Sequence, residues 1–180
     1  MAMLAGTGFA APSGGHHRGT TTVVHGTEKK LPPGLSFEHV KGQSDMVFYI
    51  KAKHSGKCMT VYRASTARGA KVNQYKCVGT KNQWWTLYNV ADLTWRITGY
   101  QSGLCLSVAG GSHKNGAPLI QWTCNGAEDQ LFMWPWSGKV IRSFESQKCL
   151  DVQGASKADN APIIQWSCNF RNNQLWQRTG

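Results

Sequence analysis

Short apolar segments with alternating polar positions recur along the chain from about residue 46. Three of these segments each begin a similar stretch of sequence: MVFYIKA at 46–52, LTWRITG at 93–99 and KVIRSFE at 139–145. Each is followed by a Gly/Ser/Gln turn, a Cys-apolar-x-Val segment, a polar loop and another apolar segment. Apolar runs of four to eight residues bounded by turn residues predict short β-strands. The pattern therefore predicts an all-β fold with four strands in each of three repeats, about twelve in all.

The cysteines carry the same repeat. They stand in three successive pairs, each with a spacing of 19 residues, and the pairs recur after 47 and then 44 residues. Six cysteines allow about 15 pairings, and the repeat favours one of them, namely Cys58–Cys77, Cys105–Cys124 and Cys149–Cys168. Six buried free thiols are the alternative, and zinc is disfavoured because no CxxC grouping occurs. Three disulfides would indicate an oxidising compartment.

The segment before the repeats has a different character. Residues 1–13, MAMLAGTGFAAPS, resemble the end of a secretion signal with a cut near Ala10 or Ala11, although the positive region that normally precedes it is missing. Residues 14–45 are polar and rich in Gly, Thr, Pro and His, which predicts a flexible N-terminal arm or linker. His16 and His17 could hold a metal weakly, and a solvated tail is the alternative.

Positive charge is unevenly distributed along the chain. The formal charge is +11, and residues 46–92 contribute +7, because only Asp92 opposes eight basic residues: Lys51, Lys53, Lys57, Arg63, Arg68, Lys71, Lys76 and Lys81. The second repeat balances to zero and the third to +3. This surface could face an anionic glycan, a teichoic-acid-like polymer or an acidic protein, or it could simply be solvated. No nucleic-acid-binding motif is present, so we expect no nucleic-acid partner.

Each repeat ends in a Gln-x-aromatic motif. The three copies are Gln83-Trp84-Trp85, Gln130-Leu131-Phe132 and Gln174-Leu175-Trp176. Three repeats of about 45 residues, each with a cysteine pair and a terminal QxW, resemble the ricin-B-type lectin family. The resemblance implies a β-trefoil over 46–180, with lobes 46–92, 93–137 and 138–180 and with the last aromatic of each motif in the core. It also implies carbohydrate binding.

The third repeat matches the sugar site that this resemblance implies. The site uses an Asp two places after the first cysteine, an aromatic near the second, and the Asn and Gln of the last motif; here these are Asp151, Trp166, Asn173 and Gln174. An aromatic face stacks on a pyranose, and carboxylate and amide groups satisfy its hydroxyls. Where the family often has a further Gln, this repeat has Ile164, with Gln165 shifted by one place.

The other two repeats depart from that pattern. The second has Ser107, Trp122, Asp129 and Gln130, and the first has Thr60, Tyr75, Asn82 and Gln83. Because a hydroxyl replaces the charged acceptor, we expect these secondary sites to be altered or lost. Structural alternatives stay open: the glutamines could brace turns, Asp151 could cap a turn, and Trp166 could pack. Trp134 and Trp136 could form an exposed patch or pack locally.

These observations favour a secreted, extracellular, non-enzymatic lectin that binds glycans or a cell-surface polysaccharide. No GxSxG, HExxH or phosphate-loop motif occurs, and we expect no cofactor and no metal. No apolar run reaches the roughly 18 to 20 residues of a membrane span. The alternative is a docking or targeting subunit of a secreted toxin or hydrolase complex, or a protease-inhibitor-like trefoil. A protein partner would then bind the 14–45 arm or the basic first lobe.

Overall fold

The computed structural model describes residues 47–135 and 138–179. The predicted signal-like segment, the predicted arm and Trp136 lie outside this range. The described residues form twelve strands: β1 (Val47–Ala52), β2 (Cys58–Val61), β3 (Val72–Tyr75), β4 (Trp85–Ala91), β5 (Thr94–Gly99), β6 (Cys105–Val108), β7 (Leu119–Trp122), β8 (Leu131–Met133), β9 (Arg142–Ser143), β10 (Cys149–Val152), β11 (Ile163–Trp166) and β12 (Trp176–Thr179). Four strands fall in each repeat, as the sequence predicts.

Six of the strands form a ring. Strand β1 pairs with β12 and β4, β4 with β5, β5 with β8, and β8 with β9, all antiparallel. The ring closes within the third lobe, where a bridge between Val140 and Leu175 joins the segment before β9 to the residue before β12, and the Trp176 amide donates to the Lys139 carbonyl at 2.6 Å. The ring leaves few open strand edges, which single four-stranded repeats would expose.

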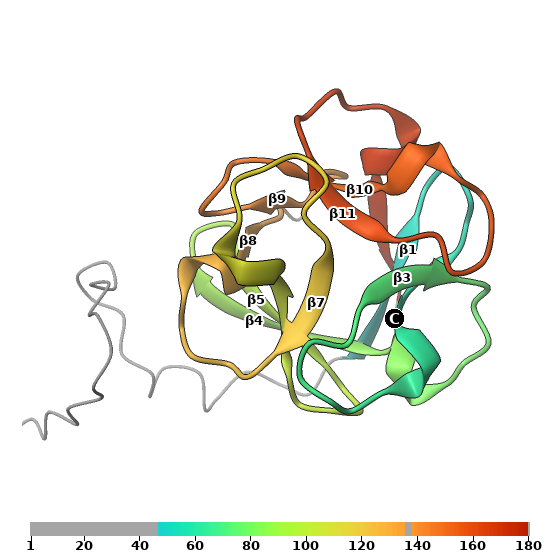
Figure 1. Ribbon diagram of the computed structural model, residues 1–180, viewed down its shortest axis with the longest axis horizontal. Helices are drawn as coiled ribbons and strands as arrows, with labels where there is room; N and C mark the ends of the chain where they lie inside the picture. Colours follow the sequence, from blue (N-terminus) through green and yellow to red (C-terminus); the bar gives the residue numbers. More distant parts are fainter. Residues whose placement is uncertain (1–46, 136–137, 180) are drawn as a thin grey trace, which may run out of the picture. The chain divides into compact units, whose positions relative to one another are not determined.

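The other six strands form three hairpins, β2–β3, β6–β7 and β10–β11. Three isolated bridges connect them, and they join Lys71 to Ile120, Asn73 to Pro162 and Pro118 to Ile164. Figure 1 shows the three lobes arranged around a common axis, with one hairpin from each lobe near the centre. A ring of six strands and three connected hairpins in threefold arrangement is a β-trefoil, which confirms the predicted fold.

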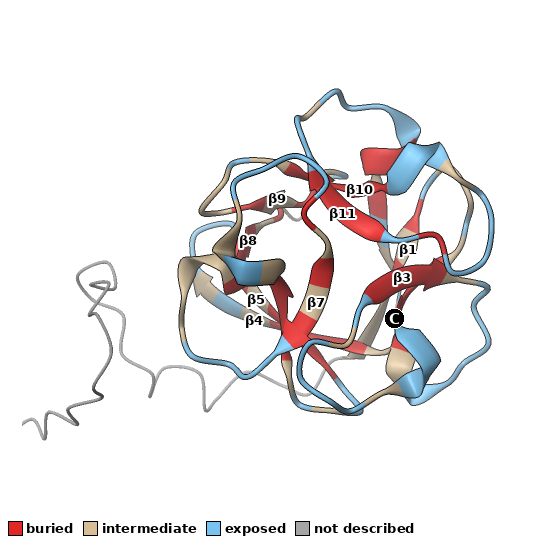
Figure 2. Ribbon diagram, in the orientation of Figure 1, coloured by how far each residue is buried: buried red, intermediate tan, exposed pale blue. Residues whose placement is uncertain are grey.

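The aromatic residues of the QxW motifs lie in the shared core. Trp85, Phe132 and Trp176 are fully buried, as predicted, and Figure 2 shows buried segments along the strands and exposed loops around them. The indole nitrogens of Trp85 and Trp176 donate to carbonyls of their own hairpins. Trp134 is also buried and donates to the Gly138 carbonyl at 3.2 Å. Local packing is therefore the correct interpretation of Trp134.

All three predicted disulfides are formed, with Cα atoms 5.1–5.2 Å apart. Each one joins the first residue of a hairpin to the chain just after that hairpin. Closing a loop of this length stabilises the fold by roughly 3 kcal/mol. The disulfides therefore fix the hairpin ends from which the candidate site residues project.

A buried glutamine in each hairpin clamps one lobe to the next. The Gln74, Gln121 and Gln165 side chains are fully buried. Each amide nitrogen donates to two backbone carbonyls in a loop of a neighbouring lobe, and each amide oxygen accepts from a serine in its own lobe. Because buried polar groups need partners, these clamps fix how the lobes pack.

Within the described residues, no helix is long and apolar enough to cross a membrane.

Candidate functional site

Strand alternation places the third-lobe residues on one face of their hairpin. Trp166 pairs with Cys149, and Asp151 pairs with Ile164. Because side chains alternate along a strand, Asp151 and Trp166 share a face, and Gln165 points to the opposite one. The Trp166 side chain is 42% exposed, and Asp151 is 4% exposed. An open aromatic surface and a recessed carboxylate therefore stand side by side.

The Asp151 carboxylate is held by two amides. Asn173 Nδ2 and Gln174 Nε2 each donate to Asp151 Oδ2 at 2.8 Å. Both amides come from the short 3₁₀ segment Asn172–Gln174, which precedes β12. Asp151 Oδ1 has no hydrogen-bond partner among the described residues. The carboxylate is thus fixed in orientation, and one oxygen is left to accept a hydrogen bond.

Burial raises the pKa of Asp151 above its ordinary value. The hydrogen bonds from Gln174 and Asn173, and the positive influence of His54, act in the opposite direction but do not cancel it. The two groups that donate hydrogen bonds to the carboxylate are neutral amides, so neither brings a positive charge to offset the burial. Asp151 therefore takes up a proton at a higher pH than an exposed aspartate does.

The glutamines of the QxW motifs brace turns. Gln174 donates to the Ser167 carbonyl and accepts from the Asn169 and Phe170 amides. Gln83 and Gln130 make the equivalent contacts in their own lobes. All three are fully buried, with both amide atoms engaged. This geometry favours the bracing interpretation over direct ligand contact.

The second lobe keeps a carboxylate at a different position. Ser107 Oγ donates a hydrogen bond to Asp129 Oδ2. The acid stands in the 3₁₀ segment Glu128–Gln130, and the partner stands on β6. Trp122 is 41% exposed, like Trp166, and the Arg68 guanidinium lies 5.9 Å from its ring centre. The Ser107–Asp129 pair thus reverses the Asp151–Asn173 arrangement: the sequence named both residues for this site, and the structure adds the hydrogen bond between them.

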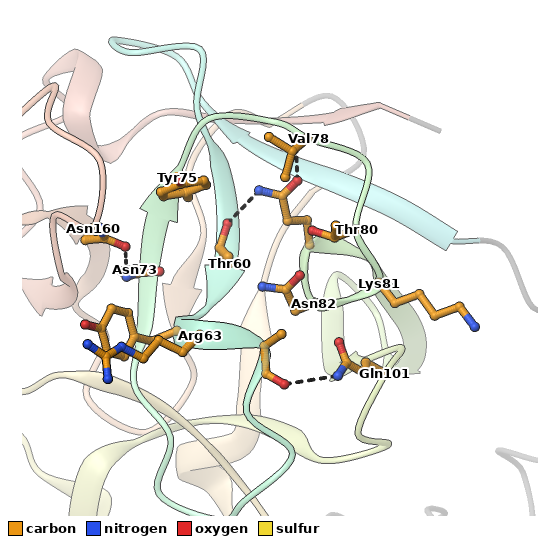
Figure 3. A pocket seen from close by; sticks show the side chains of 13 residues that line it. Thr60, Arg63, Asn73, Tyr75, Val78, Thr80, Lys81, Asn82, Gln101 and Asn160 are labelled. Carbon is orange, nitrogen blue, oxygen red and sulfur yellow. Dashed lines mark hydrogen bonds between the residues drawn. The ribbon is translucent and has the colours of Figure 1, made fainter.

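The first lobe has no carboxylate at either position. Thr60 Oγ1 donates to the Cys58 carbonyl and accepts from Gln83 Nε2, and Asn82 Nδ2 donates to the Val61 carbonyl. These residues line a depression of about 790 Å³, together with the half-buried Tyr75. Figure 3 shows Thr60, Asn82 and Tyr75 around this depression. The site is hollow, but its acceptors are neutral.

Asn73 belongs to the first-lobe site and was missed by the sequence reasoning. It is paired with Thr60 across the hairpin, lines the depression and donates to Asn160 Oδ1 at 3.1 Å. It stands two places before Tyr75, at the position where the third repeat has Ile164. That alignment was sufficient to identify it.

The first-lobe and third-lobe sites also adjoin a loop of a neighbouring lobe. Asp159 Oδ1 accepts from the Lys76 amide at 3.0 Å and from Lys57 Nζ at 2.6 Å. Asn115 Oδ1 accepts from the Ser167 amide at 3.0 Å. Both contacted amides directly follow the aromatic residue of the site, so a neighbouring loop contacts the end of each of these two hairpins. No group of three metal-ligating side chains occurs among residues 47–135 and 138–179.

Comparison with known proteins agrees with this geometry. The model of the ricin-type β-trefoil lectin domain matches residues 46–176. No curated protein matches the chain. Among solved structures, the designed threefold symmetric protein ThreeFoil is 34% identical, with a TM-score of 0.72, and the match covers 74% of this chain and 98% of that protein.

Two natural structures extend the comparison. The exo-β-1,3-galactanase 1,3Gal43A from Clostridium thermocellum is 31% identical, with a TM-score of 0.71, and the match covers 75% of this chain and 30% of the enzyme. The C-half of the earthworm R-type lectin, solved in complex with GalNAc, has a TM-score of 0.60 at 18% identity, over 73% of this chain and 96% of that one, and shows the fold alone. The domain match, the QxW repeats and the threefold strand arrangement establish that this chain belongs to the ricin-type β-trefoil lectin family.

Proposed function

We propose that this protein is a carbohydrate-binding lectin whose best-formed site for neutral sugars lies in the third lobe. The observation that carries the proposal is the pairing of the exposed Trp166 face with the oriented Asp151 carboxylate. The ring supplies an apolar surface for the C–H face of a pyranose. The carboxylate supplies a charged acceptor, which makes stronger hydrogen bonds to hydroxyls than a neutral group does.

The arrangement supports binding without catalysis. Asp151 is hydrogen-bonded to two amides, whereas glycoside hydrolysis ordinarily uses two carboxyl groups that flank the scissile bond. The second lobe contributes a second site of the same chemistry, formed by Trp122 and the Ser107–Asp129 pair. Single shallow sites bind weakly, so the protein acts through several sites on one glycan surface.

The three disulfides support an extracellular location, because such bonds persist in oxidising compartments. The test is the thiol state of the protein isolated from its source. We expect no free thiols before reduction and six after it. Free thiols in the isolated protein would contradict this location.

The direct test of the lectin proposal is glycan-array binding of the full chain beside single variants. The similarity to the galactanase makes β-1,3-linked galactose oligosaccharides the first probes, followed by mannose and xylose series. We expect Asp151→Asn and Trp166→Ala to weaken binding of the preferred neutral glycan at least tenfold. The matched control is Asp92→Asn, which removes an exposed carboxylate in the first lobe and should leave binding unchanged.

Two outcomes would contradict the proposal. If binding survives both third-lobe variants and disappears in Trp122→Ala, the second lobe is the principal site. If the wild-type chain binds no glycan, the trefoil is a docking module, and its partner must then be sought among secreted proteins.

A further inference from the structure

The first-lobe depression continues into a second cavity. The second cavity has a volume of about 290 Å³ and shares Tyr62, Asn73 and Asn160 with the depression. It reaches Pro118 of the second lobe and Pro162 of the third, both of which take part in the bridges between the hairpins. Together the two cavities form a groove, called the first-lobe groove below, which extends from the threefold bridges to the turn after β3. Its combined size exceeds that of one monosaccharide and fits an oligosaccharide.

The lining of this groove is positive and contains no acidic residue. Arg63 and Lys81 line the larger cavity, and Lys71 lines the smaller one. No acidic side chain among the described residues pairs with any of these three, since the described ion pairs are Lys57–Asp159 and His113–Glu145. In Figure 3 the Lys81 side chain extends away from the other labelled groups. Arg63 and Lys71 are therefore the cations most directly available to a ligand in the groove.

Arg63 occupies a backbone position that disfavours arginine. Its φ is 52°, in the left-handed region, and the equivalent positions in the other lobes are Gly110 and Gly154, both with φ of 64°. A residue with a Cβ in this region costs about 1 kcal/mol relative to glycine. Backbone strain of this kind clusters at functional sites. The guanidinium lies 5.2 Å from the Tyr62 ring centre and has no hydrogen-bond partner among the described residues.

Asn73 provides an unused acceptor at the junction of the two cavities. Its side chain is 3% exposed, and its Oδ1 is buried without a hydrogen-bond partner among the described residues. An unsatisfied buried acceptor costs about 1–3 kcal/mol. A ligand hydroxyl that reaches this atom would remove that cost.

From these observations we propose that the first-lobe groove binds an anionic oligosaccharide, with Arg63 and Lys71 receiving its carboxylate or sulfate groups. This proposal rests on the lectin function proposed above and adds a second ligand class. The planar guanidinium matches a carboxylate or sulfate with two parallel hydrogen bonds. Tyr75 and the neutral amides take the rings and hydroxyls. The lobes would then differ in specificity: the third binds neutral sugars through a carboxylate, and the first binds acidic sugars through cations.

The test uses calorimetric titration of the full chain with three trisaccharides. The charged probes are trigalacturonate and a sulfated galactose trisaccharide, and the neutral probe is the methyl ester of trigalacturonate, which keeps the rings and removes the charge. We expect at least one charged probe to bind tenfold or more tighter than the ester, with an affinity that falls as salt rises. The charged probe that binds more tightly identifies the anionic group.

The variant for the groove is Arg63→Gly/Lys71→Gln. It should fold, because glycine stands at the equivalent position in the other two lobes, and it should lose at least tenfold in affinity for the charged trisaccharide. The matched control is Lys53→Gln/Lys139→Gln, which removes the same net charge from exposed positions outside the groove and should retain the affinity.

Two results would overturn the proposal. Equal affinity of the wild type for all three trisaccharides would show that the groove does not distinguish charged from neutral ligands. Equal losses in the two double variants show that the attraction is diffuse rather than located in the groove. Neutral glycan binding is measured on the same samples. If the protein binds a neutral glycan and Asp151→Asn weakens that binding, the lectin proposal stands although the groove proposal fails. If the protein binds no glycan of any kind, both proposals fail.

Discussion

The first and third lobes share a backbone plan and differ in the chemistry that they present on it. Both have a disulfide, a fully buried bracing glutamine and an aromatic residue opposite the first cysteine. The third lobe surrounds this frame with the Asp151 carboxylate and neutral amides. The first lobe replaces the carboxylate with Thr60 and adds Arg63 and Lys71. The comparison teaches that the fold leaves the charge of a site free to change, because the bracing glutamine needs only an oxygen acceptor at that position, and the Thr60 hydroxyl and the Asp151 carboxylate both supply one.

The largest expected effect tests what the lobes have in common. Gln165→Ala removes the partners of the Ser112 and Lys114 carbonyls and of the Ser146 hydroxyl. Leaving buried polar groups unpaired should lower the free energy of unfolding by about 2–4 kcal/mol. Urea denaturation of Gln165→Ala and Gln74→Ala should give similar losses, because Gln74 makes equivalent contacts. A loss in only one of them would show that the lobe junctions are not equivalent.

The next test separates the two sites by their acceptors. Asp151→Asn should weaken the binding of neutral glycans about tenfold, or about 1.4 kcal/mol, because a neutral acceptor replaces a charged one. The matched change in the first lobe, Thr60→Ser, keeps the hydroxyl and should leave neutral glycan binding unaffected. Titration calorimetry of both variants measures the difference. Equal effects would show that the two lobes contribute alike to neutral sugar binding.

The raised pKa of Asp151 predicts an acid dependence of binding at the third-lobe site, which the first-lobe site, without a carboxylate, does not share. As pH falls through this raised pKa, the carboxylate gains a proton and the charged acceptor is lost, so neutral glycan affinity should decrease in mild acid. Binding measured between pH 7 and pH 4 in wild type and in Asp151→Asn gives the comparison, and the variant should lack this decrease. An equal decrease in both would place the titrating group elsewhere.

The same shift has a consequence for stability. A carboxyl group whose folded pKa lies above its unfolded value makes the folded state less stable as pH rises through this range. Asp151→Asn should therefore be at least as stable as wild type at pH 7, and this advantage should disappear below about pH 3.9, the ordinary value for aspartate. Urea denaturation at pH 7 and pH 3 measures both quantities. A variant that is less stable at pH 7 would mean that hydrogen bonding outweighs burial.

The smallest effect concerns the strained arginine. Arg63→Gly relieves the left-handed conformation but increases the freedom of the unfolded chain, so the free energy of unfolding should rise by only about 0.5–1 kcal/mol. The reciprocal change in the third lobe, Gly154→Arg, should lower it by a similar amount. Thermal unfolding of the two variants tests the pair. Loss of stability in Arg63→Gly would show that Arg63 supports the fold rather than a ligand.

Regular spacing made much of the architecture predictable. The 19-residue cysteine spacing indicated the three disulfides, and the short apolar segments predicted the twelve strands. The family resemblance placed Trp85, Phe132 and Trp176 in the core. These features depend on strand periodicity and on short-range closure, which are visible in a linear pattern. Asp151 and Trp166 were identified through the resemblance to the ricin-B-type lectin family, and the structure brings them to one face.

Other features depended on contacts between distant residues. Gln165 is adjacent in sequence to the predicted sugar contact Trp166. Because side chains alternate along the strand, the Gln165 side chain points away from the site and contacts the neighbouring lobe. Ser107 replaces the aspartate of the third repeat, and its hydrogen bond to Asp129 shows that the second lobe has its carboxylate at the position of Asn173 instead. Asn73 passed unnoticed because the matching position in the third repeat is apolar. The roles of Gln165 and Ser107 depend on partners that the spacing of the repeats does not specify, whereas Asn73 could have been identified from its alignment with Ile164.

The sequence by itself determined the number of lobes, the cysteine pairing, the identity of the core aromatics and the excess of positive charge in the first lobe. Only the tertiary structure decided which of those charges line a groove, which polar groups are already satisfied and which acceptor is left unused. The reason is physical: periodicity sets the face on which a side chain lies, whereas burial and hydrogen bonding depend on residues that are distant in sequence and are brought together when the three lobes close around their axis.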